Sequence, residues 1–156
     1  MTPISLQTTS KTALGSSQQI GKMIKPHLTD REVQQIQMEE IVIYTDGSCI
    51  NNGQEDAQAG SGIWYGENDP RNKALKVPGK TQSNQTSELY AALQVAKTTP
   101  KETPLLIRSD SEYVINGLTK NLTHWEDKGW IGVSNSEMFK VTAAWLRSRS
   151  STTSLQ

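Results

Sequence analysis

The sequence predicts a mixed α/β (α+β) fold: three antiparallel strands, then a helix and a parallel fourth strand, with helices on both faces of the sheet. Residues 41–44 form an apolar run rich in β-branched residues that ends at Asp46-Gly47, which indicates a strand. Two further strand-like runs follow after short turns, and short turns favour antiparallel pairing. From residue 83 the apolar residues recur every three or four positions, which is typical of an α-helix.

The composition narrows the class of protein. A chain of 156 residues suits one domain, and a mean hydropathy of −0.58 is low for a chain that is packed throughout. Sixteen basic and sixteen acidic residues give zero net charge, so binding to nucleic acid would need a local basic patch. One cysteine and two distant histidines exclude an intramolecular disulfide and a Cys/His zinc cluster. No apolar run approaches membrane-spanning length, so we expect a soluble intracellular protein with no membrane association.

The chain divides at about residue 40. Residues 1–39 are rich in Ser, Thr and Gln and are predicted to be a disordered tail followed by a linker or a short helix. That helix would begin near Asp30 and carry a weak apolar stripe at Val33 and Ile36. Residues 40–156 are predicted to form the compact domain.

The first predicted strand is apolar on both faces from Ile41 to Tyr44. A strand of this kind is covered on both sides and lies centrally in its sheet. We expect it to end at Asp46-Gly47, where a strand does not easily continue. The second and third strands are predicted at residues 60–65 and 73–77, each bounded by turns rich in Gly, Pro and Asn.

The helical pattern of residues 83–97 follows, with Ser83 or Asn84 as its N-cap. Residues 105–107 predict a short buried strand that again leads to a carboxylate, Asp110. The remaining predicted elements are a helical segment from Ser111, a loop that contains Trp125 and Trp130, and an amphipathic helix over residues 136–147.

Three carboxylates occupy related positions in this arrangement. Asp46 and Asp110 each follow a strand, and parallel neighbouring strands bring their carboxyl ends to one edge of the sheet. Glu88 lies in the first turn of the helix between them, on the flank of its apolar stripe. Carboxylates directed at one point repel each other unless a cation lies there, and hard divalent ions such as Mg²⁺ prefer oxygen ligands. The sequence therefore predicts a divalent-metal site suited to phosphodiester hydrolysis.

Each carboxylate also has a structural explanation of its own. Asp46 can be a turn residue before Gly47, Glu88 an acid favoured by the helix dipole, and Asp110 the N-cap of the next helix. The consistent topological position of all three favours a shared site over coincidence.

Several ordered motifs resemble those of type 1 ribonuclease H, and the resemblance extends from about residue 40 to residue 156. The motifs are YTDGSC at 44–49, NQTSEL at 84–89, SDSEYV at 109–114, ING at 115–117 and the Trp125 to Trp130 segment. The resemblance implies the ribonuclease H fold and hydrolysis of the RNA strand of an RNA–DNA hybrid, which leaves a 5′-phosphate and a 3′-hydroxyl. It implies Mg²⁺ as the cofactor, with Mn²⁺ as the alternative, and Asp46, Glu88 and Asp110 as catalytic metal ligands.

The same resemblance implies contacts to an RNA–DNA hybrid as the partner. The residues at minor-groove positions are Cys49, Asn52, Ser83, Asn84 and Gln85, and those that line the channel of the DNA strand are Tyr113 and Trp125. Small polar groups suit the wide, shallow minor groove of such a duplex. Cys49 can equally be a small core residue, and Ser83 and Asn84 helix caps; Trp130 is expected in the core. Nothing in the sequence indicates a protein partner, and a monomer is expected.

The sequence departs from the family pattern in two places. Glu126 and Asp127 stand where lysines are expected, so affinity that rests on counterion release should be low. Leu155-Gln156 resembles the start of the family's fifth strand, while the remainder of that strand, a His-containing loop, a fourth acidic residue and a final helix do not follow. We therefore expect an incomplete domain, without the fifth strand and final helix, with the fourth strand as an exposed edge and with reduced or no cleavage.

Two functional hypotheses remain open. The first is an active hybrid nuclease, and the second is a catalytically weak or inactive module that at most binds nucleic acid. A phosphotransferase of the actin and sugar-kinase type also begins with a strand that ends in Asp-Gly. Such an enzyme needs a second Asp-Gly phosphate loop and a much longer chain, and the sequence has neither.

Overall fold

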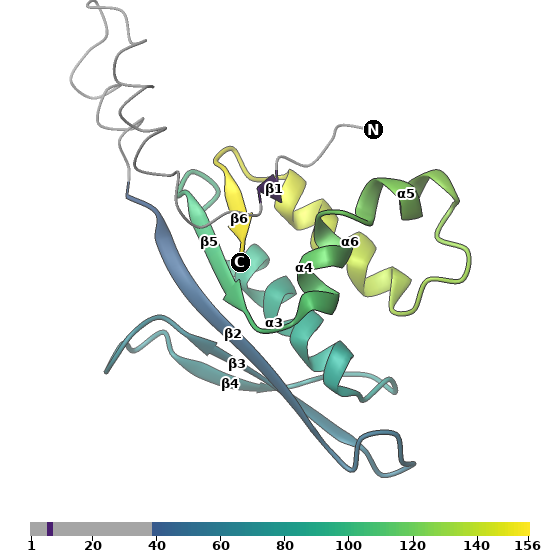
Figure 1. Ribbon diagram of the computed structural model, residues 1–156. Coiled ribbons are helices and arrows are strands. Elements are labelled where there is room, and N and C mark those ends of the chain that lie inside the picture. The colour runs from purple at the N-terminus through teal and green to yellow at the C-terminus, as the bar shows by residue number, and fades with distance from the viewer. Residues whose placement is uncertain (1–5, 8–38) are drawn as a thin grey trace, which may run out of the picture.

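The computed structural model describes residues 6–7 and 39–156, which form a single mixed sheet and four helices (Figure 1). The strands are β1 (Leu6–Gln7), β2 (Ile41–Ile50), β3 (Gln58–Trp64), β4 (Lys73–Lys76), β5 (Leu105–Ser109) and β6 (Thr153–Leu155). The helices are α3 (Asn84–Thr98), α4 (Glu112–Leu118), α5 (Leu122–Asp127) and α6 (Ser136–Arg147). The strand order across the sheet is β1-β6-β5-β2-β3-β4.

The pairing of the strands confirms the predicted fold class. β2, β3 and β4 form an antiparallel meander, whereas β5 pairs with β2 in parallel. β2 therefore lies centrally between β3 and β5, as its apolar sequence predicts. The predicted helices at residues 83–97 and 136–147 correspond to α3 and α6.

The strand at the centre of the sheet is longer than predicted. β2 does not end at Asp46-Gly47 but continues to Ile50, because Gly47 and Ser48 pair with Ser61 and Gly60 of β3. The parallel half of the pairing does end where the sequence indicates, since the last pair between β2 and β5 joins Thr45 to Ser109. Asp46 thus marks the end of the parallel ladder and not the end of the strand.

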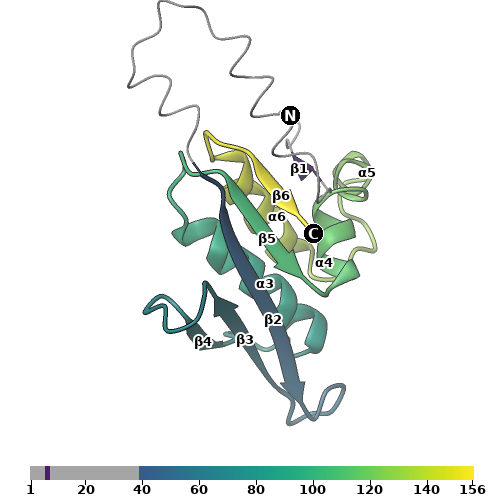
Figure 2. The same ribbon diagram turned by 60° about the vertical axis from the view of Figure 1, so that its left-hand side comes forward.

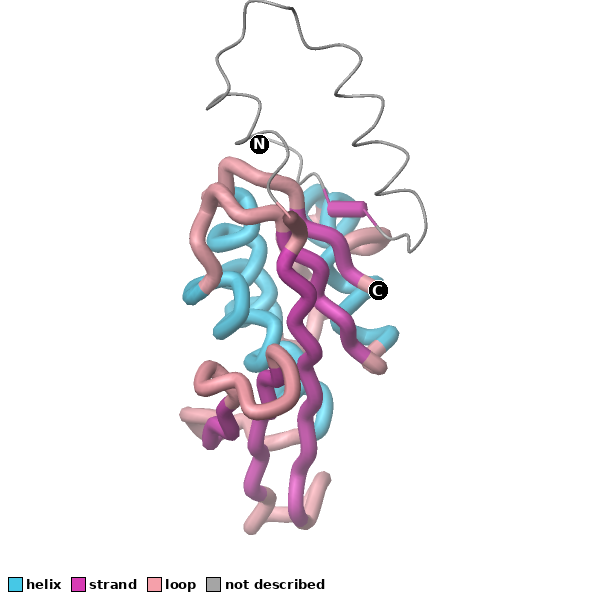
Figure 3. The backbone as a smooth tube through the Cα atoms, turned by 90° about the vertical axis from the view of Figure 1, so that its left-hand side faces the viewer, coloured by secondary structure: helices cyan, strands magenta, loops and turns pink. Residues whose placement is uncertain are grey.

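The core lies between the sheet and the helices, which form a second layer behind it (Figures 2 and 3). α3 runs along β2 and β3, and α6 packs against α3. The largest fully buried side chains come from both layers and include Ile43, Leu89, Ile107, Leu118 and Phe139. Alternation along β2 directs Ile43 and Thr45 into this core.

The other face of the sheet is open in the part of the chain that the structure describes. The expectation of helices on both faces is not met there, because Tyr44 of β2 and Trp64 of β3 are 43% and 48% exposed. These two residues are a cross-strand pair whose rings meet edge to face with centroids 5.4 Å apart. On this face the two rings therefore pack against each other and not against a helix of the described residues.

The prediction that the fifth strand is missing is wrong for residues 153–155. β6 pairs with β5 in parallel, so β5 is not the exposed edge that the sequence suggested. Thr153 and Leu155 are buried, and Arg149 fixes the approach to the strand. Its guanidinium donates to the carbonyls of Thr99 (3.2 Å), Pro100 (3.2 Å) and Thr103 and to the hydroxyl of Thr153 (3.0 Å). The polar segment of residues 148–154 is therefore anchored to the preceding loop, between α3 and β5, by one buried arginine.

The N-terminal segment is described only in part. Leu6–Gln7 pairs in parallel with Thr153–Ser154 as β1, which departs from the predicted disordered tail. The rest of that prediction and the short helix near Asp30 fall outside the described residues. Within residues 39–156, no helix combines the length and apolar character needed to cross a bilayer.

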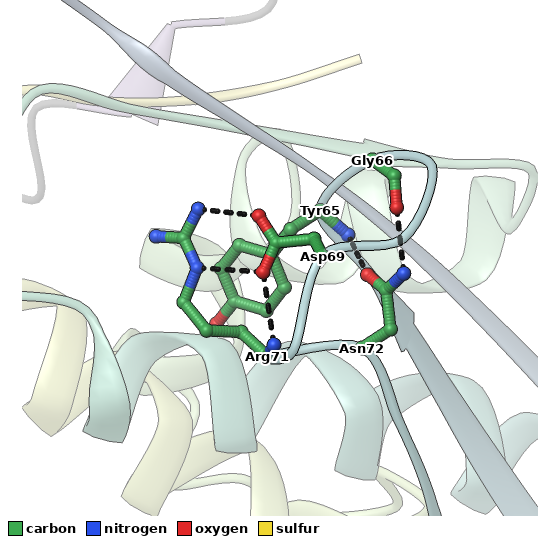
Figure 4. A network of polar contacts seen from close by, with 5 residues as sticks. All are labelled: Tyr65, Gly66, Asp69, Arg71 and Asn72. Carbon is green, nitrogen blue, oxygen red and sulfur yellow. Dashed lines mark hydrogen bonds and ion pairs between the residues drawn. The ribbon is translucent and has the colours of Figure 1, made fainter.

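A polar network shapes the turn between β3 and β4 (Figure 4). Asn72 accepts a hydrogen bond from the backbone N–H of Tyr65 and donates one to the carbonyl of Gly66, each at 2.6 Å. Arg71 pairs with Asp69 at 2.8 Å and lies over the Tyr65 ring, 4.4 Å from its centroid. The network holds the β3–β4 turn at the end of the sheet where Asn72 lines a cleft.

Candidate active site

Asp46 and Asp110 lie side by side at the end of the parallel ladder. Each is the residue directly after the last parallel pair, Thr45 with Ser109. Both line a cleft of about 810 Å³ on the open side of the sheet, together with Tyr44, Trp64, Asn72, Lys73, Arg108 and Gln156. The predicted convergence of these two carboxylates follows from the register of β2 against β5.

Glu88 reaches the same place because α3 lies close to β2. Gly47 is the contact point: a Cβ built there would stand 2.6 Å from the backbone nitrogen of Glu88. Ser61 of β3 holds the first turn of α3 close to the sheet, since its buried hydroxyl donates to the Ser87 carbonyl at 2.6 Å. The absence of a side chain at position 47 therefore lets the first turn of α3 approach the strand that carries Asp46.

The electrostatics of Glu88 show that the three carboxyl groups interact. Burial, with the nearby charges of Asp46 and Asp110, raises the pKa of Glu88 from 4.5 to about 7, against the lowering effect of a hydrogen bond from Gly47. Its Oε2 is buried and has no hydrogen-bond partner among the described residues. Asp46 accepts a hydrogen bond from the Gly47 N–H at 2.9 Å.

This donor set fits a divalent cation in its chemistry. Three carboxylates with one unpartnered buried oxygen are the hard oxygen donors that Mg²⁺ prefers. In residues 39–156, however, no three acidic, histidine or cysteine side chains stand close enough to hold one ion together.

The β2–β3 loop lies beside the N-terminus of α3. The Asn52 side chain accepts a hydrogen bond from the Asn84 backbone N–H at 3.2 Å, across 32 residues of sequence. The structure thus brings together two of the predicted minor-groove residues. Cys49 is partly exposed on β2, so it is not the core residue of the alternative explanation.

Ser83 is the N-cap of α3, as the sequence predicts. Its hydroxyl accepts from the Thr86 N–H at 3.0 Å. Asn84 and Gln85 are exposed in the first turn of the helix and available to a ligand. Capping and ligand contact are compatible for Ser83, because the same residue lines a groove.

That groove, of about 620 Å³, lies where the N-termini of α3 and α6 meet. Asn135 lines this groove. Its side-chain amide donates to the Tyr113 hydroxyl at 3.1 Å and accepts from the Thr86 hydroxyl at 3.3 Å. Burial raises the pKa of Tyr113. Sequence reasoning missed Asn135, whose φ of 54° in the structure is one that asparagine tolerates well. The groove is lined in addition by Lys80, Thr81, Ser83 and Gln85.

Trp125 is fixed by aromatic packing. It belongs to α5 rather than to a loop, and its ring meets those of Phe139 and Trp130 at centroid distances of 5.1 and 6.0 Å. Gly117 of α4 makes room for it, since a Cβ there would stand 3.1 Å from the Trp125 ring. Trp130 packs against the same core, as predicted. The predicted channel role of Trp125 stays a prediction.

One of the two acids that interrupt the family's basic segment has a structural role. Glu126 forms a two-pronged ion pair with Arg147 of α6, at 2.6 and 2.8 Å, and its side chain is 9% exposed. The hydrogen bonds from Arg147 lower the pKa of Glu126. This residue joins α5 to α6, whereas Asp127 is exposed.

Comparison with known proteins gives several relatives. Ribonuclease H1 of Rattus norvegicus is 36% identical over 94 residues, which is 59% of this chain and 33% of the relative. Ribonuclease H of Schizosaccharomyces pombe is 40% identical over 99 residues, 64% of this chain and 36% of the relative. The chain thus spans about a third of the length of these relatives.

Two solved structures share the fold. LC9-RNase H1, a type 1 RNase H with the type 2 active-site motif, superposes with a TM-score of 0.54 at 20% identity, over 76% of this chain and 63% of that one. The PFV RNase H domain gives a TM-score of 0.52 at 22% identity, over 74% and 77%. The RNase H family model matches residues 38–154, which is most of the chain. This chain belongs to the RNase H family.

Proposed function

We propose that this domain hydrolyses the RNA strand of RNA–DNA hybrids and leaves a 5′-phosphate and a 3′-hydroxyl. The observation that carries the proposal is that Asp46 and Asp110 line one cleft, while Glu88 lies behind Gly47 with a buried oxygen that lacks a partner among the described residues. Family membership supports the substrate class.

The three carboxylates are the proposed ligands of Mg²⁺, with Mn²⁺ as the alternative. When bound, such an ion activates water and stabilises the leaving oxygen of the phosphodiester. Asp46 and Asp110 hold their oxygens at the end of the parallel ladder, and the Gly47 N–H orients Asp46. Glu88 adds a third charge from the helix side, which attracts a cation and disfavours a vacant site.

The hybrid's minor groove is proposed to lie over the β2–β3 loop and the first turn of α3. The hydrogen bond between Asn52 and Asn84 holds these two segments together as one polar surface. Small amide, hydroxyl and thiol groups suit contact with 2′-hydroxyls and base edges. The residues assigned to this surface are Cys49, Asn52, Ser83, Asn84 and Gln85.

A backbone phosphate of the DNA strand is proposed to occupy the groove around Asn135. The N-termini of α3 and α6 both border this groove, and helix N-termini favour anions. Lys80 supplies the positive charge at the rim. Tyr113 is proposed to flank this groove and Trp125 to line the channel beyond it.

The direct test is cleavage of a labelled RNA–DNA hybrid by the purified chain in Mg²⁺. Product ends identify the chemistry, because a 5′-phosphate distinguishes this mechanism from one that leaves a cyclic phosphate. Asp46→Asn and Glu88→Gln should abolish cleavage. The matched control is Glu67→Gln, an exposed turn residue that leaves the site intact.

Binding of the hybrid without cleavage by the wild-type chain would instead support the second hypothesis, a module that binds nucleic acid only. Gel-shift titration separates the two outcomes. Cleavage that persists in Asp46→Asn at the wild-type rate would overturn the assignment of the site.

A further inference from the structure

The cleft that holds Asp46 and Asp110 continues into a second surface on the open face of the sheet. Side chains alternate along a strand, so Tyr44 shares its face with Asp46, and Arg108 shares its face with Asp110. The register places Tyr44 opposite Trp64 of β3 and Arg108 of β5. All five side chains line the same cleft of about 810 Å³. The two carboxylates therefore have an aromatic and basic surface directly beside them.

The two rings of this surface are available for stacking. Tyr44 and Trp64 are both exposed, and they meet edge to face, an arrangement in which each ring keeps at least one face free of its partner. Nucleobases stack on exposed aromatic rings in single-strand binding sites, because every base has a π-face. In a duplex the faces of the bases are already stacked on their neighbours. The ring pair therefore suits an unpaired base.

The charges beside the rings suit a phosphate. The Arg108 guanidinium lies 5.9 Å from the Tyr44 ring centroid, and Lys73 of β4 lines the same cleft. Both cations are exposed, and neither forms an ion pair among the residues that the structure describes. A basic groove that is edged with aromatic rings is the arrangement by which proteins bind single-stranded nucleic acid.

A polar atom in the cleft lacks a partner. The side-chain Oε1 of Gln156 is buried and accepts no hydrogen bond from the described residues. Backbone hydrogen bonds with Ile107 (3.0 Å) and Ser109 (2.9 Å) hold Gln156 beside Arg108. Buried polar atoms normally have partners, so this atom points to a ligand that donates a hydrogen bond. A ribose 2′-hydroxyl would supply that donor, and this group distinguishes RNA from DNA.

The order of residues along β2 relates this surface to the proposed path of the hybrid. Cys49 and Asn52 of the proposed minor-groove surface follow Asp46 in the chain, whereas Tyr44 precedes it by two residues. Two residues of a strand span roughly 7 Å. A nucleic-acid strand with a phosphodiester at Asp46 therefore has its neighbouring nucleotide within reach of the Tyr44 ring.

We propose that the surface formed by Tyr44, Trp64 and Arg108 binds a single-stranded segment of RNA that continues from the strand at the carboxylates. An unpaired base stacks on the aromatic pair, and Arg108 and Lys73 contact the adjoining phosphate. The identity of the strand rests on the proposed function, which assigns RNA to the carboxylates. The binding itself needs neither a metal ion nor cleavage.

The test is fluorescence anisotropy of a labelled single-stranded RNA with the full-length chain in the presence of a chelator. The probe has about ten adenosines, a length within the range that such sites cover. Trp64→Leu should weaken binding about fivefold or more, because stacking of the base is lost, whereas Trp64→Phe keeps an aromatic ring and should lose less. Arg108→Gln should lower the dependence of log Kd on log salt by about 0.7, the value for one phosphate contact on a single strand.

Two variants outside the cleft serve as matched controls. Val141→Ala shortens an exposed apolar residue of α6, and Lys97→Gln removes a charge from the last turn of α3. Both should bind the RNA as the wild type does. Circular dichroism reports whether each variant is folded, and light scattering reports its mass.

Equal affinity of folded wild type, Trp64→Leu and Arg108→Gln for the probe would overturn the proposal. A wild-type dimer that binds the RNA only after it dissociates would also overturn it, since the rings would then face a second copy of the chain. Equal affinity for single-stranded DNA of the same sequence would overturn the assignment to RNA.

The result is separable from that of the cleavage assay. A chain that binds the probe through Trp64 but cleaves no hybrid would support this inference and overturn the proposed function. A chain that cleaves the hybrid, and whose Trp64→Leu variant binds the probe as tightly as the wild type, would overturn this inference alone.

Discussion

Gly47 and Glu88 are in backbone contact across the two layers of the domain, and this contact sets the distance between the helix and the strand of the candidate site. A Cβ at position 47 would stand 2.6 Å from the Glu88 nitrogen, closer than real Cβ atoms approach. The atoms it meets are backbone atoms and a short serine side chain, so a flexible side chain cannot absorb the overlap. The relationship explains why a glycine follows Asp46.

Gly47→Ala should therefore separate α3 from β2 and displace Glu88 from the two aspartates. We expect a loss of stability of about 1–3 kcal/mol, which is typical of overpacking, and a larger loss of cleavage than stability alone explains. Urea denaturation and the hybrid cleavage assay measure the two effects. Gly60→Ala is the control, since its nearest neighbour, the Leu75 carbonyl oxygen, is 3.6 Å away; equal effects of both substitutions would contradict the argument.

Glu88 makes the stability of the metal-free protein depend on pH. Its pKa rises from 4.5 to about 7 on folding, so the folded state binds more protons than the unfolded state between these values. The stabilising effect of the proton is fully present below pH 4.5 and is lost as the pH rises through 7. Glu88→Gln removes this pH dependence. The free energy of unfolding of the variant minus that of the wild type should therefore be more positive at pH 8 than at pH 4.

The expected size of that relative gain is about 1 kcal/mol, because the carboxyl is partly exposed and water screens its interactions. Urea denaturation in the presence of a chelator at pH 4, 6 and 8 provides the measurement. A stability difference between the two proteins that is the same at all three pH values would show that Glu88 is not the titrating group.

Arg149 should be important for stability although it lies far from the cleft. Arg149→Met leaves the carbonyls of Thr99, Pro100 and Thr103 without their donor in a buried place, which should cost about 3 kcal/mol. The denaturation midpoint should fall, and β6 should exchange its amide hydrogens faster. Arg71→Met is the control, because that guanidinium is exposed and should leave the midpoint nearly unchanged. Similar midpoints for both variants would refute the anchoring role.

The parts of the fold that follow from local patterns could be predicted, and those that depend on distant partners could not. The apolar run before Asp46 predicted a central strand, but its continuation to Ile50 depends on pairing with β3, which the Gly-Ser sequence does not reveal. β6 was hidden in a polar segment because its stability comes from Arg149 and from carbonyls about 50 residues away.

The candidate site shows the same division. Asp46, Glu88 and Asp110 could be found because the apolar runs that precede the two aspartates and the turns of a helix are visible in sequence. Asn135 could not, because its contacts come from two other helices through Tyr113 and Thr86. In sequence, Glu126 appears only as an acid where the family has a lysine. Its structural role in an ion pair was hidden because its partner, Arg147, lies 21 residues away on α6.

Mg²⁺ should stabilise the folded chain through the three carboxylates. An ion that binds only the folded state adds RT ln(1 + [L]/Kd), about 1.4 kcal/mol at a concentration tenfold above Kd. The gain should exceed a simple screening effect, because the ion also relieves the repulsion that raises the pKa of Glu88. Thermal denaturation of the wild type, Asp46→Asn and the control Glu67→Gln in increasing MgCl₂, at constant ionic strength, gives the measurement. The wild type and Glu67→Gln should respond alike and Asp46→Asn much less; an equal response of all three would show that the ion does not bind at Asp46.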